Sequence, residues 1–131
     1  MLLDTSGLLC YLDRSDARHE QAMALFRSAP IRVTHSYVLS ELIPLCGARR
    51  IPRDRAFALM HDLLDSPHVA VVWVERSIHL AAMALLEERP DKSYSLCDAV
   101  SFILMRQRRL TDALTTDQHF EREGFVRLLR P

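Results

Sequence analysis

The sequence predicts one α/β domain over residues 1–131, with a mainly parallel central sheet flanked by helices on both faces. Short apolar stretches alternate with longer amphipathic ones through most of the chain, and this order is typical of parallel sheets covered by helices. The chain is 49% hydrophobic with only 3 glycines, which suits a packed core and not a disordered segment. Acidic residues directly follow two of the apolar stretches, at the edge where open α/β sheets carry their functional groups.

Five short apolar segments are expected to form the strands: 1–3, 31–34, 69–74, 113–116 and 125–129. Even an uninterrupted apolar run such as 69–74 is far too short to cross a membrane, so no membrane partner is expected. The chain begins with an apolar strand that ends in Asp4 and has no basic leader, which argues against a signal peptide.

Apolar residues at helical spacing predict the helices that join these strands. The helices are expected after residues 4–6, after residues 13–16 up to Pro30, from Ser36 to about residue 46, from Pro52 to about Ser66, from Glu75 to Glu88, from about residue 96, and near Gln118. Pro44 removes the helical hydrogen bond to the carbonyl of Ser40, so we expect a kink within one turn of Glu41.

Four acidic residues are the candidate functional groups. Asp4 and Asp117 each follow a strand, and Asp98 lies in the first turn of an amphipathic helix. Each of these three could instead cap a helix, since aspartate is among the preferred capping residues. Glu41 lies at the edge of an apolar helical stripe. A buried, unpaired carboxylate costs several kcal/mol, so Glu41 either has a cationic partner or reaches solvent at the border of the stripe.

If the strands that precede Asp4 and Asp117 are neighbours, all four acids can converge at one edge of the sheet. Such a cluster cannot stay fully ionised without a cation, because each negative charge raises the pKa of the others. Hard oxygen ligands suit Mg²⁺ or Mn²⁺. Ions held by acids activate water and stabilise the charge of a phosphodiester under attack. The residues alone therefore predict a metal-dependent phosphodiesterase.

The chain resembles the PIN-domain ribonucleases, of the kind found as toxins of VapBC toxin–antitoxin pairs. Four sequence pieces carry the resemblance, in order and across nearly the whole chain: Leu2-Leu3-Asp4-Thr5-Ser6, Ser40-Glu41-Leu42, the run from Ser95 to Phe102 around Asp98, and the run from Ala113 to Phe120 around Asp117 with Gly124-Phe125. Each piece is weak alone, whereas the ordered set is specific.

The resemblance implies a cytoplasmic endoribonuclease that depends on Mg²⁺ or Mn²⁺ and hydrolyses RNA. It implies Asp4 and Asp98 as the surest metal ligands, with Glu41 and Asp117 completing the site directly or through water. Ser6 and Thr116 match hydroxyl positions of such sites. Members of the family often form homodimers and are neutralised by a cognate antitoxin, so we expect both partners here.

Several other polar residues invite a functional interpretation. His119 is interpreted as a first-turn surface residue, with proton transfer as the alternative, because metal-activated water needs no histidine. Zinc is not expected, since the 6 histidines and 3 cysteines lack zinc-ligand spacing. The cysteines lie in apolar helical segments, so they are expected to be free and buried in a protein of the reducing cytoplasm.

The formal net charge is +0, so RNA binding must rest on a local basic patch. Two arginine runs are candidates, one at residues 49–55 and one at 106–109. A solvated surface is the simpler explanation of both, and cations at a helix carboxyl end also complement its dipole.

Two alternatives to the nuclease stay open. The first is a catalytically silent PIN-fold module that binds another protein. The second is a phosphotransferase with Asp4 as the nucleophile, since an aspartate after the first strand suits that chemistry. The usual aspartyl-phosphatase signature has a second acid where Ser6 stands in this chain, which disfavours the phosphotransferase.

Overall fold

The five strands form one parallel sheet in the order β3-β2-β1-β4-β5. The computed structural model describes residues 1–131. The strands are β1 (Leu2–Leu3), β2 (Arg32–His35), β3 (Val69–Val72), β4 (Asp112–Leu114) and β5 (Val126–Arg127). Every pair of neighbours is parallel, so the sheet type predicted from the alternation of strands and helices is confirmed. The first strand lies in the centre, which explains why it is wholly apolar.

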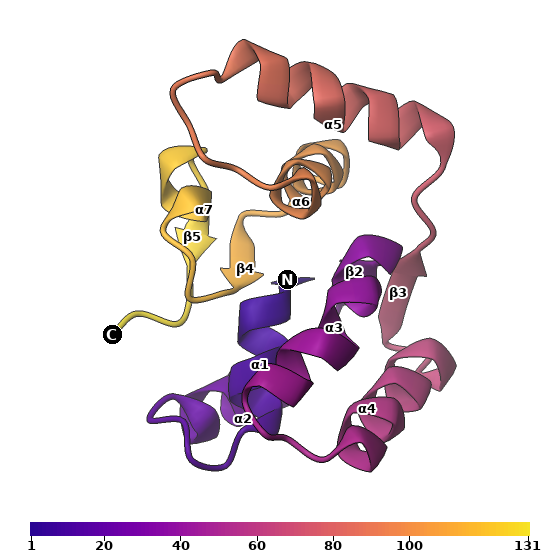
Figure 1. The fold of residues 1–131 in the computed structure, drawn as a ribbon, viewed down its shortest axis with the longest axis vertical. Coiled ribbons are helices and arrows are strands. Elements are labelled where there is room, and N and C mark those ends of the chain that lie inside the picture. The colour runs from indigo at the N-terminus through magenta and orange to yellow at the C-terminus, as the bar shows by residue number, and fades with distance from the viewer.

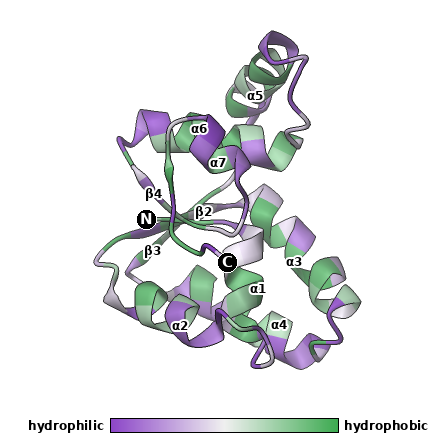
Figure 2. Cartoon of the chain, turned by 90° about the vertical axis from the view of Figure 1, so that its left-hand side faces the viewer, coloured by the Kyte–Doolittle hydropathy of each residue, from purple (hydrophilic) through white to green (hydrophobic).

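Seven helices cover the two faces of the sheet (Figure 1). They are α1 (Thr5–Leu12), α2 (His19–Ser28), α3 (Ser36–Ala48), α4 (Arg53–Asp65), α5 (Arg76–Glu88), α6 (Leu96–Gln107) and α7 (His119–Arg122). Helices α1 to α4 lie on one side, and α5, α6 and α7 lie on the other, with the sheet between them in the view of Figure 2. The expectation of helices on both faces is therefore confirmed.

Each face of the sheet has its own hydrophobic core. Leu3 and Leu114 pack with α1 to α4, whereas their neighbours Leu2 and Ala113 pack with α5 to α7. Successive residues of a strand point to opposite faces, and this alternation divides the two cores. In Figure 2 the apolar residues of the helices gather on the sides that face the sheet. Burial of these side chains is the main favourable contribution to folding.

The observed helices agree with the predicted ones to within a few residues, with one difference of detail. Pro52 was expected as the first residue of α4, but it precedes the helix with an extended backbone (φ −56°, ψ 138°) and Arg53 begins it. Helix α3 contains Pro44 and continues to Ala48, as its apolar pattern predicted, and the kink near Glu41 stays a prediction. The three cysteines are free and buried, as expected. None of the helices is both long enough and apolar enough to span a membrane.

Candidate active site at the carboxyl edge of the sheet

The register between β1 and β4 brings two of the predicted acids to the same edge of the sheet. Leu2 pairs with Ala113 and Leu3 with Leu114, so the next residues along the two strands, Asp4 and Thr115, lie side by side. The backbone N–H of Asp4 also donates to the carbonyl of Leu114, at 3.2 Å. Asp117 follows two residues after Thr115. Adjacent parallel strands therefore place Asp4 and Asp117 at the edge where the sequence predicted them.

Asp4 is an almost fully buried carboxylate that is only 5% exposed. Its Oδ2 atom accepts hydrogen bonds from Ser6 Oγ at 2.9 Å and from Thr115 Oγ1 at 2.7 Å. Burial raises the pKa of Asp4 to about 6, the two hydroxyl bonds oppose this shift, and the charge of Asp98 adds to it. Asp4 precedes α1 but makes no side-chain capping bond. Capping therefore does not explain Asp4.

Asp98 has a structural role as well as a place in the site. It is the third residue of α6 and forms a capping box with Ser95: Asp98 N–H donates to Ser95 Oγ, and Ser95 N–H donates to Asp98 Oδ2, both at 3.0 Å. Burial raises the pKa of the Asp98 carboxyl, and the charge of Asp117 adds to this shift. The capping box thus fixes the Asp98 side chain beside a second carboxylate.

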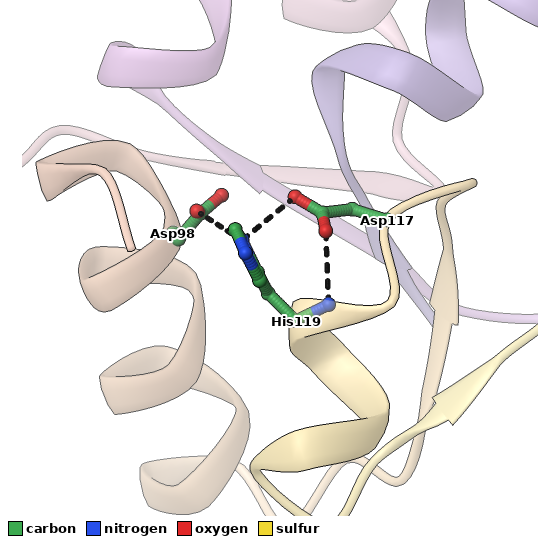
Figure 3. A group of neighbouring side chains, drawn as sticks. All are labelled: Asp98, Asp117 and His119. Atoms are coloured by element: carbon green, nitrogen blue, oxygen red, sulfur yellow. Dashed lines mark hydrogen bonds and ion pairs between the residues drawn. The ribbon is translucent and has the colours of Figure 1, made fainter. Parts of the chain in front are cut away.

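His119 lies between Asp98 and Asp117 (Figure 3). Its Nδ1 atom is 3.4 Å from Asp98 Oδ2 and 3.3 Å from Asp117 Oδ2. The backbone N–H of His119 donates to Asp117 Oδ1 at 2.9 Å, a bond that turns the chain back towards the site. The His119 side chain is 17% exposed. It is a first-turn residue, as interpreted, but it contacts two acids and does not simply extend into solvent. The sequence indicates this contact only through the position of His119, two residues after Asp117.

Glu41 reaches the same edge from α3. Its Oε2 atom accepts a hydrogen bond from Thr5 Oγ1 at 2.9 Å, so it contacts the residue that follows Asp4. Glu41 also adjoins the buried thiol of Cys97. Burial raises the pKa of Cys97, and the charges of Glu41, Asp4 and Asp98 add to this effect. Glu41 therefore borders the other acids through Thr5 and Cys97 and does not simply extend into solvent.

The donor atoms at this edge fit a divalent cation. One oxygen each from Asp98 and Asp117 and one ring nitrogen of His119 all lie within 4.8 Å of one another. Asp4 and Glu41 are not part of this group, although the charge of Asp98 adds to the raised pKa of Asp4. A cation would compensate the electrostatic cost that raises the pKa values of Asp4 and Asp98. Carboxylate oxygens suit Mg²⁺ and Mn²⁺, and an imidazole nitrogen suits transition metals.

The hydroxyl groups of the site differ from the predicted pair in one residue. Ser6 Oγ contacts Asp4 and accepts the backbone N–H of Thr116 at 3.0 Å. The second hydroxyl on Asp4 belongs to Thr115 and not to Thr116. Thr115 Oγ1 also accepts the backbone N–H of Asp117, at 3.0 Å. Thr115 thus links Asp4 to the segment that carries Asp117, a role that the sequence analysis missed because two threonines are adjacent.

The two arginine runs lie away from the acids and are partly used in ion pairs. Arg49 pairs with Asp16 at 3.1 Å, and Arg106 pairs with Glu123 at 3.5 Å. Helix α6 begins beside the site and has 12 residues, so its carboxyl end, with Arg108 and Arg109, is about 18 Å further along its axis. These observations favour the interpretation of both runs as solvated surface.

Comparisons with known proteins agree with this architecture. The family model described as PIN domain matches residues 1–126. The chain is similar to the "23S rRNA-specific endonuclease VapC20" of two Mycobacterium tuberculosis strains, with 31% identity over 96% of this chain and 95% of the relative. It also superimposes on the crystal structure of VapC20 from that organism, described as a sarcin–ricin loop cleaving toxin. That match has a TM-score of 0.87 and 30% identity, and it covers 99% of this chain and 98% of the other.

Proposed function

The chain belongs to the PIN-domain family, and from this premise we propose that it is a metal-dependent endoribonuclease and the toxin of a type II toxin–antitoxin pair. The observation that supports this proposal is the group formed by Asp98, Asp117 and His119 at the carboxyl edge of the sheet. Thr115 links this group to the buried Asp4, and the carboxyl pKa values of Asp4 and Asp98 are raised. Four segments of the chain bring Asp4, Glu41, Asp98 and Asp117 to this edge, although burying each charge costs free energy. A metal site accounts for this arrangement.

We assign Asp98 and Asp4 as the principal ligands of Mg²⁺ or Mn²⁺, with Asp117 and Glu41 completing the site directly or through water. A divalent cation bound there would lower the pKa of a bound water molecule and would place positive charge opposite the phosphodiester. The chain itself orients these carboxylates. Ser6 and Thr115 hold Asp4, the capping box holds Asp98, and Thr5 holds Glu41.

Structured RNA of the ribosome is the substrate class that we propose. The support is the similarity to VapC20, an endonuclease described as specific for 23S rRNA and as cleaving the sarcin–ricin loop. The similarity extends over almost the whole of both chains, so the compared region spans the candidate site. The protein would act in the cytoplasm, where ribosomal RNA is found and where its three free cysteines stay reduced.

The test of substrate class is cleavage of labelled RNAs by the purified protein in Mg²⁺ or Mn²⁺. The set contains a hairpin with the sarcin–ricin loop, the same stem with a scrambled loop, an unstructured RNA and the DNA counterpart of the hairpin. We expect cutting within the sarcin–ricin loop and little cutting of the DNA. Equal cutting of RNA and DNA would contradict the assignment as a ribonuclease.

We also propose a homodimer and a cognate antitoxin as partners, on the basis of the family. Co-expression with a candidate antitoxin, followed by affinity capture, tests the antitoxin, and light scattering after size exclusion tests the dimer. A captured partner that suppresses RNA cleavage supports a toxin. A silent binding module is the remaining alternative, and it predicts a partner without RNA cleavage by the free protein. The phosphotransferase gains no support, because Asp4 is buried with two hydroxyls on Oδ2.

A further inference from the structure

His119 supplies a side-chain nitrogen that contacts two acids of the site. Its Nδ1 atom lies 3.3 Å from Asp117 Oδ2 and 3.4 Å from Asp98 Oδ2. Ligand bonds of about 2.1 Å in an octahedral site place adjacent donor atoms about 3 Å apart. The spacing of the three donor atoms is therefore already close to that of ligands around one ion. Figure 3 shows the ring edge with Nδ1 directed at both carboxylates.

The imidazole ring is held in this orientation from two sides. Its other nitrogen, Nε2, lies 3.4 Å from Ser93 Oγ. The ring of Tyr94 packs edge-on against it, with ring centroids 5.1 Å apart. A histidine that binds a metal through one ring nitrogen almost always donates the other N–H to an acceptor, which fixes the tautomer. Ser93 can accept that N–H, and this leaves the lone pair of Nδ1 free to face the acids.

A simpler explanation is that His119 only donates a hydrogen bond to the acids. A neutral ring has one N–H, and if that N–H is on Nδ1 it serves two carboxylates at once while Nε2 must accept from Ser93. The two contacts of Nδ1 are at the long end for hydrogen bonds, at 3.3 and 3.4 Å. A cation between the three groups would satisfy Asp98, Asp117 and His119 together. The ligand explanation thus accounts for more of the geometry.

We propose that His119 is a nitrogen ligand of this metal centre and that it makes the centre prefer Mn²⁺ to Mg²⁺. Magnesium binds almost entirely through oxygen and keeps much of its water, whereas imidazole suits transition metals. Replacing one oxygen ligand by an imidazole nitrogen therefore costs magnesium more than manganese. The inference rests on the proposed function, because it takes the acid cluster to be a metal site.

The direct test is pulsed electron paramagnetic resonance of the Mn²⁺-loaded full-length protein. Coupling of the manganese electron spin to a nitrogen nucleus is expected in the wild-type protein and is expected to be lost in His119→Gln. His68→Gln is the matched control, because His68 is exposed and precedes β3 at the opposite edge of the sheet. Wild-type Mn²⁺ bound without nitrogen coupling would overturn the inference, and this result needs no variant to fold.

Calorimetric titration with Mn²⁺ and with Mg²⁺ measures the preference itself. We expect His119→Gln to weaken Mn²⁺ binding by about tenfold or more, since losing even an outer partner of a ligand costs about 10–100-fold in metal affinity. Mg²⁺ binding should change less, so the ratio of the two dissociation constants should fall. An unchanged ratio overturns the inference but leaves the nuclease proposal intact. Absence of Mn²⁺ and Mg²⁺ binding in the wild-type protein would remove the metal site altogether.

Discussion

Asp4 is a buried carboxylate whose charged form lowers the stability of the metal-free fold. Its carboxyl is buried and its pKa is raised from 3.8 to about 6, so the folded protein binds this proton more tightly than the unfolded chain does. The stability that the neutral form contributes is present below about pH 4 and is lost as the pH rises through about 6. In metal-free buffer near pH 8 the charged Asp4 therefore destabilises the fold.

We predict that Asp4→Asn abolishes RNA cleavage and stabilises the metal-free protein. The gain in the free energy of unfolding should reach up to about 3 kcal/mol at pH 8, since each pKa unit corresponds to about 1.4 kcal/mol, and should vanish near pH 4. Urea denaturation at both pH values measures it. Asp112→Asn is the control, because Asp112 is exposed on β4, and it should change neither stability nor cleavage. A loss of stability at pH 8 in Asp4→Asn would contradict the account.

His35 is the second residue whose burial should appear in the pH dependence. It is fully buried, its Nε2 atom is 2.8 Å from Ser101 Oγ, and its Nδ1 atom has no partner. Burial lowers the pKa of His35 from 6.5 to about 4. Its neutral form therefore contributes stability that is present above about pH 6.5 and is lost as the pH falls towards 4. This dependence is opposite in sign to that of Asp4 over the same range.

We therefore predict that the free energy of unfolding falls more steeply with decreasing pH in Asp4→Asn than in the wild type. In the Asp4→Asn background, the free energy of unfolding should fall by about 3 kcal/mol between pH 7 and pH 4 through His35, because the shift is more than two pKa units. Adding His35→Gln should flatten this slope, whereas adding His61→Gln should not, since His61 is exposed. Equal slopes in the two double variants would argue against the buried neutral histidine.

At the scale of elements, the approach of α1 to β4 aligns the acids. A Cβ atom on Gly7 of α1 would lie 1.9 Å from the carbonyl oxygen of Leu114. Backbone atoms cannot move aside as side chains do, so only glycine permits this contact. The contact holds α1 against the strand that continues into Thr115, whose hydroxyl binds Asp4.

We predict that Gly7→Ala destabilises the protein by about 3 kcal/mol or more, because overpacking costs about 1–3 kcal/mol even where side chains can adjust. The matched variant is Gly47→Ala in α3, where a Cβ would meet nothing within 4 Å. That change should stabilise by up to about 1 kcal/mol through helix propensity. Thermal unfolding of both variants checks the pair. Equal melting temperatures would show that α1 and β4 are not in close contact.

The elements themselves could be predicted well from the sequence, for identifiable reasons. Strand and helix periodicities differ, Pro30 and Pro67 separate segments, and Ser95 caps α6 as its residue type favours. What could not be predicted were details that depend on tertiary contacts. Thr115 and Thr116 are chemically identical, and only the pairing of β1 with β4 decides which one meets Asp4.

His119 was missed for a related reason. The first turn of a short helix after a strand is usually solvated, and the sequence does not show that α6 packs against this turn. Only the tertiary fold brings Asp98 of α6 and Asp117 within 3.4 and 3.3 Å of the same ring nitrogen. The acids could therefore be identified as candidate site residues from their types and positions in the sequence, whereas the contact of His119 with them depends on the tertiary fold.

In the whole molecule, a parallel sheet between two layers of helices positions the candidate site at the carboxyl edge of the sheet. Asp98 from α6 and Asp117 and His119 from the segment after β4 form one group there, and Thr115 links Asp4 to that segment. The central strand is only two residues long and wholly buried, so Asp4 is fixed by both cores. The chain and VapC20 are similar over nearly the full length of both chains, so they share the whole fold that positions this site.

The most direct measurement of the central claim is the single-turnover rate of RNA cleavage as Mn²⁺ or Mg²⁺ is added to metal-free protein, for the wild type and for Asp98→Asn. We predict no cleavage without metal, a rate that rises to saturation in the wild type, and at least a 100-fold loss in the variant, of the order found when one charge-stabilising group is removed. Circular dichroism should show both proteins folded. Cleavage that persists in chelator, or a folded variant that cuts at the wild-type rate, would contradict the account.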